Sequence, residues 1–335
     1  MRKLAKVVEI DGIEAIANAD AIELATVGGW KVVVKKGEYQ SGDKAIYLEI
    51  DSFLPEGNPL WQFLVDKSSR IYDGVKGHVL KSVKLRGKVS QGLLLPLTED
   101  TAVGTDLTEA LGISKYEPSI PANLAGEAEG LFPRSIPKTD QERVQNLSSQ
   151  WDILRGNLYE VTEKVEGCSM TVYLIDGKFG VCSRNLDLKE NPDNTLWKVA
   201  IAQQLQFKLG QVATAISSSN VAFQGELIGE GIQGNYYGIK GHAFYLFDIY
   251  DVDRQVYLMP DLVRGLCEQY LVAHCPIIKR VANISAQSIE SLLEWADEKS
   301  ILNPQKNREG LVFKSADGDR CSFKAISNKF LLGQK

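Results

Sequence analysis

One lysine lies between two acidic residues in the stretch TEKVEGCSM, residues 162–170. Lys164 stands in a strand-like run that ends at Gly167, and Glu163 and Glu166 flank it. A lysine that is partly removed from water beside other cations loses its proton more readily, and its amine can then attack a phosphorus or carbonyl centre. Most lysines in strands simply face solvent. The pattern therefore indicates a nucleophile only if the rest of the chain supplies a site around it.

Further groups that suit phosphoryl transfer follow Lys164 along the chain. Such a reaction needs carboxylates for a divalent metal, an aromatic surface for a base and additional cations for phosphate. The chain contains these in order: Arg184 in CSRN, Glu226 in QGELIG, Phe247 in FYLFDIYD, Glu309 in REGLVFK and Lys324 in CSFKAISNKF. The three histidines are too scattered to indicate a metal site of their own.

Three glycines in GELIGEGIQGNYYG, residues 225–238, have the G-x-G-x-x-G spacing. A dinucleotide-binding loop needs a helix directly after these glycines, and a protein kinase needs downstream V-A-I-K and H-R-D motifs. The chain continues instead with NYYGIKGHAFYLFD, a turn and strand pattern, and contains neither kinase motif. Gly229, Gly231 and Gly234 are thus predicted to form a tight loop beside an apolar strand.

The ordered series K-x-E-G, S-R-N, G-E-L-I-G, F-Y-L-F-D-I, E-G-L-V-F-K and a terminal lysine strand resembles the six motifs of the covalent nucleotidyltransferases. This superfamily comprises ATP-dependent RNA and DNA ligases and mRNA capping enzymes. Within it, the chain is most similar to RNA ligases of the phage and Naegleria type, over residues 141–335. GEGIQGNYYG followed by FYLFDI is similar to the RNA-ligase form of the third motif, which places the glycines in a loop after the Glu226 strand.

The resemblance implies a role for each motif residue. Lys164 is the nucleophile that takes AMP from ATP as a lysyl phosphoramidate, and Lys324 and Arg184 assist at the phosphates. Phe247 stacks on adenine. The residues implied to bind the nucleotide are Lys164, Glu163, Ser169, Arg184, Glu226, Phe247, Lys324 and Arg143. Those implied to position Mg²⁺ or Mn²⁺ are Glu166, Glu226 and Glu309.

Two motifs depart from the family pattern. The first motif commonly reads K-x-D-G, whereas this chain has Glu166 in place of the aspartate. The last motif commonly has two lysines two residues apart, whereas this chain has Lys324 followed by Ile326. The family lysine that Lys324 matches is therefore open, and Lys329 is a partial substitute for the other.

The hydrophobic patterns predict two domains joined by a linker. Residues 1–112 are dense in short strands and predict an all-β barrel of the OB type. Four prolines without periodicity predict a linker over 113–140. Residues 141–335 mix strands and helices, which predicts an α+β domain with antiparallel sheets, and the resemblance makes this an ATP-grasp-like nucleotidyltransferase (ligase) domain.

Local signals predict individual elements within these domains. A hairpin turn is expected at Asp176-Gly177, and two strands are expected on either side of Arg86-Gly87. A short helix is expected near PLWQFLVDK, and a longer one is expected in TLWKVAIAQQLQFKLG with its end at Gly210. The stretch SAQSIESLLEWADEK predicts a helix that begins at serine caps, and PKTDQERVQN places Arg143 at a helix start.

The first domain also contains a cluster of basic residues. NADAIELATVGGWKVVVKKGEYQSGDKAIYLEIDSFLP resembles OB modules that precede the catalytic domain in Naegleria-type RNA ligases and occur in some tRNA-binding proteins. The basic residues are Lys67, Arg70, Lys76, Lys81, Lys84, Arg86 and Lys88. They are either a solvated strand face or a surface that follows RNA phosphates. We expect no second OB domain after the last motif.

Composition limits the class of protein. The chain has 335 residues, 44% apolar and 24% charged, with a net charge of −5, which is typical of a globular protein that does not coat nucleic acid as a whole. Its five cysteines form no C-x-x-C pair, so neither a disulfide framework nor a zinc knuckle is indicated. No apolar run reaches the ~20 residues of a membrane span. We expect a cytoplasmic protein that contacts no membrane and is a monomer.

The predicted function is an ATP-dependent RNA ligase. It joins 3′-OH and 5′-phosphate ends through lysyl-AMP and RNA-adenylate, with RNA, including a nicked duplex, as a candidate substrate. Two alternatives stay open on the sequence. One is a capping-type transferase that uses GTP, and the other is a non-catalytic RNA-binding protein that acts through the OB domain.

Overall fold

In a computed structural model of the chain, the described residues are 3–64, 69–116, 127–317 and 320–333. The chain forms two compact units, one of residues 1–120 with 331–335 and one of residues 121–330. The division falls within the span that was expected to be a linker. No helix in the described residues is long and apolar enough to cross a membrane.

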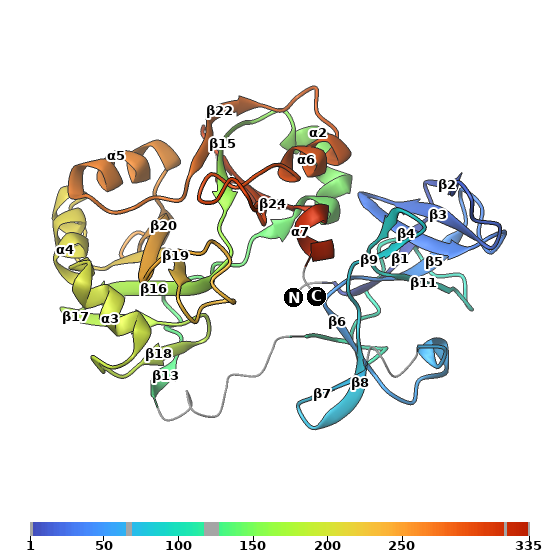
Figure 1. The fold of residues 1–335 in the computed structure, drawn as a ribbon, viewed down its shortest axis with the longest axis horizontal. Helices are drawn as coiled ribbons and strands as arrows, with labels where there is room; N and C mark the ends of the chain where they lie inside the picture. The colour runs from blue at the N-terminus through green and yellow to red at the C-terminus, as the bar shows by residue number, and fades with distance from the viewer. Residues whose placement is uncertain (1–2, 65–68, 117–126, 318–319, 334–335) are drawn as a thin grey trace. The chain divides into compact units, whose positions relative to one another are not determined.

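The first unit is built from short antiparallel strands, as the sequence predicted (Figure 1). Its strands form the sheets β1-β5-β11, β2-β3-β4, β12-β6-β8-β7 and β10-β9. Their bounds are β1 Ala5–Glu9, β2 Gly12–Ala15, β3 Ile22–Val27, β4 Trp30–Lys35, β5 Lys44–Leu48, β6 Ser52–Pro55, β7 Ser69–Tyr72, β8 Val75–Val79, β9 Val83–Leu85, β10 Lys88–Ser90, β11 Leu93–Pro96 and β12 Ser114–Lys115. A 3₁₀ turn, η1 (Pro59–Trp61), replaces the short helix expected there.

Alternation of apolar and polar residues explains how these strands bury one face. In β4, Trp30, Val32 and Val34 are buried while Lys31 and Val33 are half-exposed. The Trp30 and Tyr47 rings lie 5.9 Å apart in the core. Because successive side chains of a strand point to opposite faces, this pattern holds the register of the sheet.

The second unit contains two sheets. One has the order β13-β18-β17-β16-β19-β20-β21 and the other the order β14-β24-β23-β15-β22, and only the β14–β24 pair is parallel. The strands are β13 Ala128–Leu131, β14 Glu142–Arg143, β15 Leu158–Lys164, β16 Cys168–Ile175, β17 Lys178–Cys182, β18 Leu186–Leu188, β19 Val221–Gly229, β20 His242–Asp251, β21 Val256–Tyr257, β22 Ile277–Asn283, β23 Gly310–Ser315 and β24 Ser322–Ile326.

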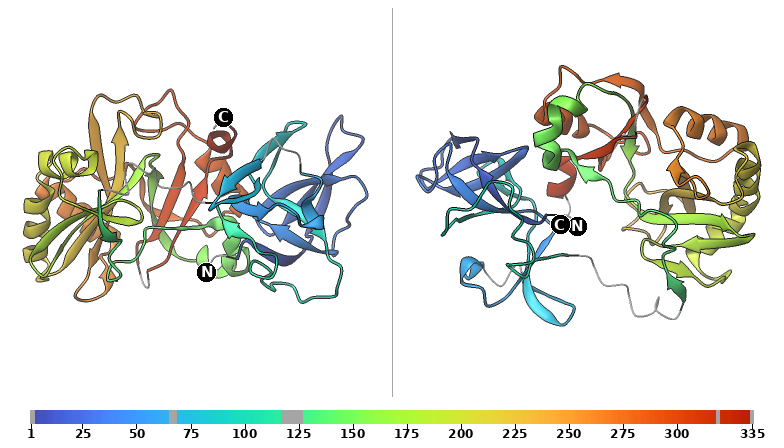
Figure 2. Two further views of the ribbon diagram at one scale, coloured as in Figure 1. Left: turned by 90° about the horizontal axis from the view of Figure 1, so that it is seen from below. Right: turned by 180° about the vertical axis from the view of Figure 1, so that it is seen from behind.

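Helices cover each sheet of the second unit on one face, as Figures 1 and 2 show. The seven-stranded sheet packs against α3 (Thr195–Ala202), α4 (Leu205–Ala215) and α5 (Pro260–Tyr270). The five-stranded sheet packs against η3 (Val144–Gln150), α2 (Trp151–Leu154) and α6 (Ile289–Ala296). A last helix, α7, spans Asn328–Gly333.

The chain passes directly from one sheet to the other between Lys164 and Cys168. Lys164 is the last residue of β15, and Cys168 is the first residue of β16 in the other sheet. Gly167 makes this passage possible, since a Cβ there would lie 2.4 Å from the carbonyl oxygen of Leu227. The passage therefore sets the end of β15 close to Glu226 and Leu227, in the second half of β19.

Two local expectations differ from the structure. The predicted helix that ends at Gly210 is two helices, which are separated at Gln204 with φ of 54°, and the second one continues to Ala215. Leu209, Val212 and Ala213 bury their side chains in the core, so packing overrides the low helix propensity of Gly210. The span 113–140 also contains β12 and β13, which pair with β6 and β18.

Candidate active site

Lys164 and Glu309 form the centre of the site. In the antiparallel pairing of β15 with β23, Lys164 lies opposite Gly310, the residue after Glu309. The amine of Lys164 contacts both carboxylate oxygens of Glu309 at 2.7 Å. The Lys164 side chain is 26% exposed and the Glu309 side chain is 12% exposed, so the pair is shielded but still accessible to a ligand.

Two more carboxylates surround this ion pair. Glu166 lies in the passage after β15, where its backbone N–H donates to the Tyr237 hydroxyl at 2.7 Å. Glu226 lies on β19 in the other sheet. Burial and the nearby Glu309 raise the pKa of Glu166 to about 7. Burial, with Glu309 and Glu166 close by, raises the pKa of Glu226 to about 8.

These carboxylates change the expected protonation of Lys164. Burial lowers the pKa of Lys164, but the charges of Glu309, Glu226 and Glu166 outweigh burial, so the pKa is raised above its ordinary value. The sequence-based expectation of a lysine without its proton is therefore wrong for the ligand-free protein. The amine is an ammonium here, and it needs compensation of the surrounding negative charge before it can act as a nucleophile.

Lys324, in contrast to Lys164, has a lowered pKa. It lies on β24 opposite Arg143 of β14, in the one parallel pair of the sheet. Burial, then the positive charges of Lys164 and Arg143, lower the pKa of Lys324 to about 7. Arg143 is itself buried and directly precedes the 3₁₀ helix η3 rather than an α-helix. Together these groups concentrate positive charge beside Lys164.

Ser169 and Arg184 are both tied to the segment before β14. Ser169 on β16 lies opposite Glu226 of β19, and its hydroxyl is 3.3 Å from that of Thr139. The Arg184 guanidinium donates to both carboxylate oxygens of Asp140, at 2.9 and 3.1 Å. Thr139 and Asp140 did not stand out in the sequence, because they lie in an aperiodic stretch outside the motifs.

Phe247 lies at a β-bulge whose backbone is contacted by a charged side chain. The pairing of β20 with β19 shifts by one residue at Phe247. The Lys314 amine donates to the Phe247 carbonyl, lies 5.4 Å from its ring centroid and pairs with Asp248 at 3.0 Å. Arg320 contacts the same Asp248 oxygen at 2.8 Å. Sequence reasoning missed this network, although Lys314 is the final residue of the E-G-L-V-F-K motif.

Family models match both units of the chain. Residues 157–326, about half of the chain, match the model described as RNA ligase. The chain belongs to the RNA ligase family. Residues 4–97 match a model described as an OB-fold domain. The predicted fold class, an N-terminal OB domain followed by a nucleotidyltransferase domain, is therefore confirmed.

Solved structures of the Naegleria gruberi RNA ligase are similar over nearly the whole chain. A lysine-to-methionine variant with AMP and Mn is 45% identical, covers 98% of each chain and has a TM-score of 0.89. A lysine-to-alanine variant with ATP and Mn gives the same identity, coverage and TM-score. The enzyme with PPi is 45% identical, covers 99% of this chain and 98% of that chain, and has a TM-score of 0.88. The chain matches none of the curated proteins.

Glu163 and Lys164 lie on opposite faces of β15 in this RNA ligase. Its buried carboxylate accepts hydrogen bonds from the Ser300 hydroxyl and from the backbone N–H of Ile301. Adjacent strand residues point to opposite faces, so a flanking position in sequence is a distant one in the site. The structure thus brings together the other predicted residues of the first motif but sets the Glu163 side chain apart from them.

The three predicted metal-binding carboxylates surround Lys164 without converging on one point. Glu166, Glu226 and Glu309 each influence the pKa of Lys164. Within the described part of the ligase, no group of three or more acidic, histidine or cysteine side chains is placed to ligate one metal ion directly. Oxygen donors of this kind are nevertheless the ligands that Mg²⁺ and Mn²⁺ prefer, and such ions commonly keep several waters.

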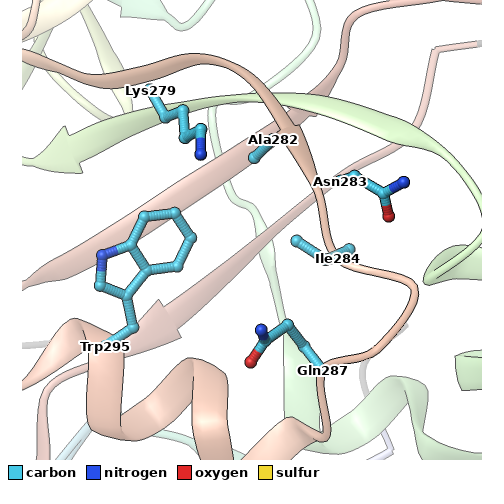
Figure 3. Close-up of a pocket in the computed structure, with 6 residues that line it drawn as sticks. All are labelled: Lys279, Ala282, Asn283, Ile284, Gln287 and Trp295. Atoms are coloured by element: carbon cyan, nitrogen blue, oxygen red, sulfur yellow. The ribbon is translucent and has the colours of Figure 1, made fainter.

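A separate pocket lies on the far side of the five-stranded sheet. Figure 3 shows Trp295 of α6 facing the strand that carries Lys279 and Ala282. The other lining residues are Asn283, Ile284 and Gln287. None of the predicted site residues lines this pocket. The helix α6 packs on the face of β15 opposite to Lys164.

The glycine-rich stretch of the ligase is a turn, as the sequence predicted. Gly229, Gly231 and Gly234 have φ of 137°, 77° and 66°. A Cβ at Gly229 would lie 2.1 Å from the Gly241 carbonyl oxygen, so only glycine fits where β19 leaves the sheet. No helix follows the glycines directly; the chain turns back into β20.

The basic cluster of the OB domain lies on and around β7 to β10. Arg70, Lys76, Lys81, Lys84, Arg86 and Lys88 are exposed. Lys76 pairs with Glu56 at 2.8 Å. Lys67 lies outside the described residues.

Proposed function

We propose that this chain is an ATP-dependent RNA ligase whose nucleophile is Lys164. The observation that supports this most directly is that Lys164 pairs with Glu309 at the junction of two sheets, with Glu166, Glu226 and Lys324 close by. This chain is 45% identical to Naegleria gruberi RNA ligase, whose structures contain ATP and Mn or AMP and Mn. This similarity supports ATP as the substrate and a divalent metal as the cofactor.

The first step forms a bond between Lys164 and AMP. The amine attacks the α-phosphorus of ATP, the bond to the β-phosphate oxygen breaks, and pyrophosphate leaves. The 5′-phosphate of RNA then attacks the same phosphorus and breaks the P–N bond, which gives RNA-adenylate. Finally the 3′-OH attacks the 5′-phosphorus and AMP leaves. These displacements depend on placement and on cations where charge develops.

Glu309, Glu226 and Glu166 control the proton of Lys164. In the ligand-free protein they hold the amine as an ammonium. Mg²⁺ or Mn²⁺ would be held by these carboxylates and would supply positive charge that compensates them and polarises the phosphate. Once the negative charge of these carboxylates is neutralised, burial is the main influence left on the pKa of Lys164, and burial lowers it. The amine then releases its proton more readily.

The remaining residues bind the nucleotide. Lys324 and Arg143 place positive charge where the phosphates of ATP lie, and a bound anion returns the lowered pKa of Lys324 toward its ordinary value. Phe247 offers its ring to adenine, and the Lys314 contact with its carbonyl fixes the bulge. Arg184, held by Asp140, is placed to contact a phosphate of the nucleotide or of RNA.

Labelling with radioactive nucleotide tests this function. Incubation with α-labelled ATP and Mg²⁺ or Mn²⁺ should leave label on the protein, and Lys164→Ala should abolish it. Lys198→Ala, an exposed lysine on α3, is the control that should keep the label. Label from GTP instead of ATP would identify a capping-type enzyme, and a wild-type chain that takes label from neither would refute the proposal.

End-joining assays define the RNA substrate. We propose RNA on at least the 3′-OH side of the junction, with a nicked duplex as one of the forms that are sealed. Nicked RNA duplex, nicked DNA duplex and single strands, each with both metals, would separate these substrates. RNA binding without any joining would support the non-catalytic alternative.

A further inference from the structure

An arginine occupies a turn position that favours aspartate, asparagine or glycine. Among the described residues, three hairpins have a two-residue turn in which a residue other than glycine precedes a glycine: Asp73-Gly74, Arg86-Gly87 and Asp176-Gly177. Their first residues have φ of 49°, 46° and 51°, in the left-handed region. Aspartate tolerates this region through local hydrogen bonding, whereas a long side chain such as arginine is disfavoured there. A strained residue in an exposed loop points to a function for its side chain.

The hairpin that carries Arg86 is fixed at its base and exposed at its tip. The backbone N–H of Leu80 donates to Ser52, and the N–H of Gln91 donates to Lys31. The Ser90 hydroxyl accepts from the N–H of Val33 in β4. Beyond these anchors, residues 83–88 of β9, the turn and β10 are all exposed. The tip is therefore presented by a rigid base rather than by a free loop.

The charge of this segment is opposite to that of the whole chain. Residues 74–98 contain five lysines and arginines and no aspartate or glutamate, whereas the chain has a net charge of −5. Within the described parts of the structure, Lys81, Lys84, Arg86 and Lys88 make no ion pair or side-chain hydrogen bond. Their charges are consequently available to a polyanion.

The cations of the hairpin lie on both faces and at the tip. Lys88 pairs with Leu85 and Lys84 pairs with Val89 in the β9–β10 register. Because cross-strand partners share a face and successive residues alternate, Lys84 and Lys88 project to opposite faces. Arg86 lies between them at the turn. A flat acidic protein surface would meet one face only, whereas a groove between two phosphate strands meets both faces and the tip.

We propose that the β9–β10 hairpin inserts into a groove of double-stranded RNA, with Arg86 at the groove floor and Lys84 and Lys88 on the flanking phosphates. The minor groove of an A-form helix is wide and shallow and displays 2′-hydroxyls and base edges between its phosphates, which a hairpin tip with cations on both sides can reach. The inference rests on the proposed function only in taking RNA as the partner. The turn at Arg86-Gly87 places the exposed arginine at the end of the hairpin.

Substitutions at the tip separate RNA binding from folding and from adenylation. In Arg86→Asn the backbone conformation is retained by a residue that favours it, so the Tm should be unchanged or higher. Its affinity for a short RNA duplex should fall ~10-fold with little change in the slope of log Kd against log salt, because Arg86 lies at the groove floor rather than on a phosphate. Lys84→Gln and Lys88→Gln should each weaken binding and decrease the slope of log Kd against log salt by about 1, because these lysines contact phosphates. Labelling of Lys164 by ATP should stay at the wild-type level.

Two control variants alter similar residues outside the β9–β10 hairpin. Lys36→Gln removes an exposed cation of the same domain in the loop after β4, and Asp73→Asn alters the neighbouring hairpin turn. Both should bind duplex RNA with the wild-type salt slope. An Arg86→Asn protein with unchanged duplex affinity would overturn the proposal, as would an equal loss on single-stranded RNA. Loss of ATP labelling in the wild type would instead count against the proposed function alone.

Discussion

The amine of Lys164 contacts both carboxylate oxygens of Glu309 at 2.7 Å, although 145 residues separate the two in the chain. The antiparallel register of β15 and β23 creates this contact, because it sets Lys164 opposite Gly310. The contact keeps the lysine at the site and keeps it protonated, so one ion pair both positions the nucleophile and restrains it until a ligand binds.

Glu309→Gln should make Lys164 more reactive in the absence of nucleotide and metal. Loss of the negative charge removes the main neighbour that raises the pKa of Lys164. Each unit by which the pKa falls gives ~10-fold more neutral amine at a fixed pH below it. The rate of acetylation of Lys164 at pH 8, followed by mass spectrometry of the digested protein, measures this change.

An internal reference guards this experiment against general unfolding. The exposed Lys198 on α3 should react at the same rate in both proteins. Glu309→Asp keeps the charge and should stay close to the wild type. Equal acetylation of Lys164 in wild type and Glu309→Gln would show that Glu309 does not hold the proton.

Lys324→Met should change how stability depends on pH. The pKa of Lys324 is about 7 in the folded chain, whereas it is 10.5 for the ordinary side chain. Below pH 7 Lys324 is charged in both the folded and the unfolded protein, so the folded wild type is destabilised by the full free energy of burying an ammonium. Between pH 7 and about 10.5 the unfolded state binds more protons, so this cost shrinks as the pH rises. The Tm difference, variant minus wild type, should be largest at pH 6 and smaller at pH 9.

Lys329→Met provides the comparison for that pH series. Lys329 is exposed and follows Lys324 by five residues, and it donates to the backbone carbonyl of Asp297. Its Tm difference from the wild type should not vary over the same pH range. A Tm difference for Lys324→Met that stays constant from pH 6 to 9 would mean that Lys324 keeps an ordinary pKa.

The sequence predicted most of the site because its chemistry is local to short motifs. Glu226, Phe247, Glu309 and Lys324 each stand in a strand or at its end, where apolar alternation marks the element and a charged or aromatic residue interrupts it. The same alternation could have excluded Glu163, since residues 163 and 164 are neighbours in one strand and face opposite sides.

Other features depend on contacts between distant segments and could not be predicted. The raised pKa of Lys164 follows from carboxylates on three separate segments, which the sequence cannot place in space. The continuation of α4 through Gly210 follows from the burial of Leu209 and Val212 against the sheet. Propensity favours a helix end at glycine, but burial of these apolar side chains is worth more than the ~1 kcal/mol penalty.

Phe247→Leu should weaken ATP binding without unfolding the protein. If the ring stacks on adenine, its loss removes about 1–3 kcal/mol, which is a rise in the KM for ATP of roughly 5- to 150-fold. The matched variant is Phe244→Leu on the same strand, whose ring is fully buried in the core. That variant should lower the Tm and leave the KM for ATP unchanged. An equal KM for ATP in Phe247→Leu and in the wild type would show that Phe247 does not stack on adenine.

Asp248→Asn should destabilise the second unit more than Lys314→Met does. The Lys314 and Asp248 side chains are only 4% and 3% exposed, and Asp248 also pairs with Arg320. Neutralising Asp248 leaves two cations without their anion, at a cost of about 3–5 kcal/mol for a buried pair. Removing Lys314 leaves Asp248 paired with Arg320, so the loss is smaller. Urea unfolding of both variants and of the double variant measures the coupling, and a larger loss for Lys314→Met would show that Asp248 is not the centre of this network.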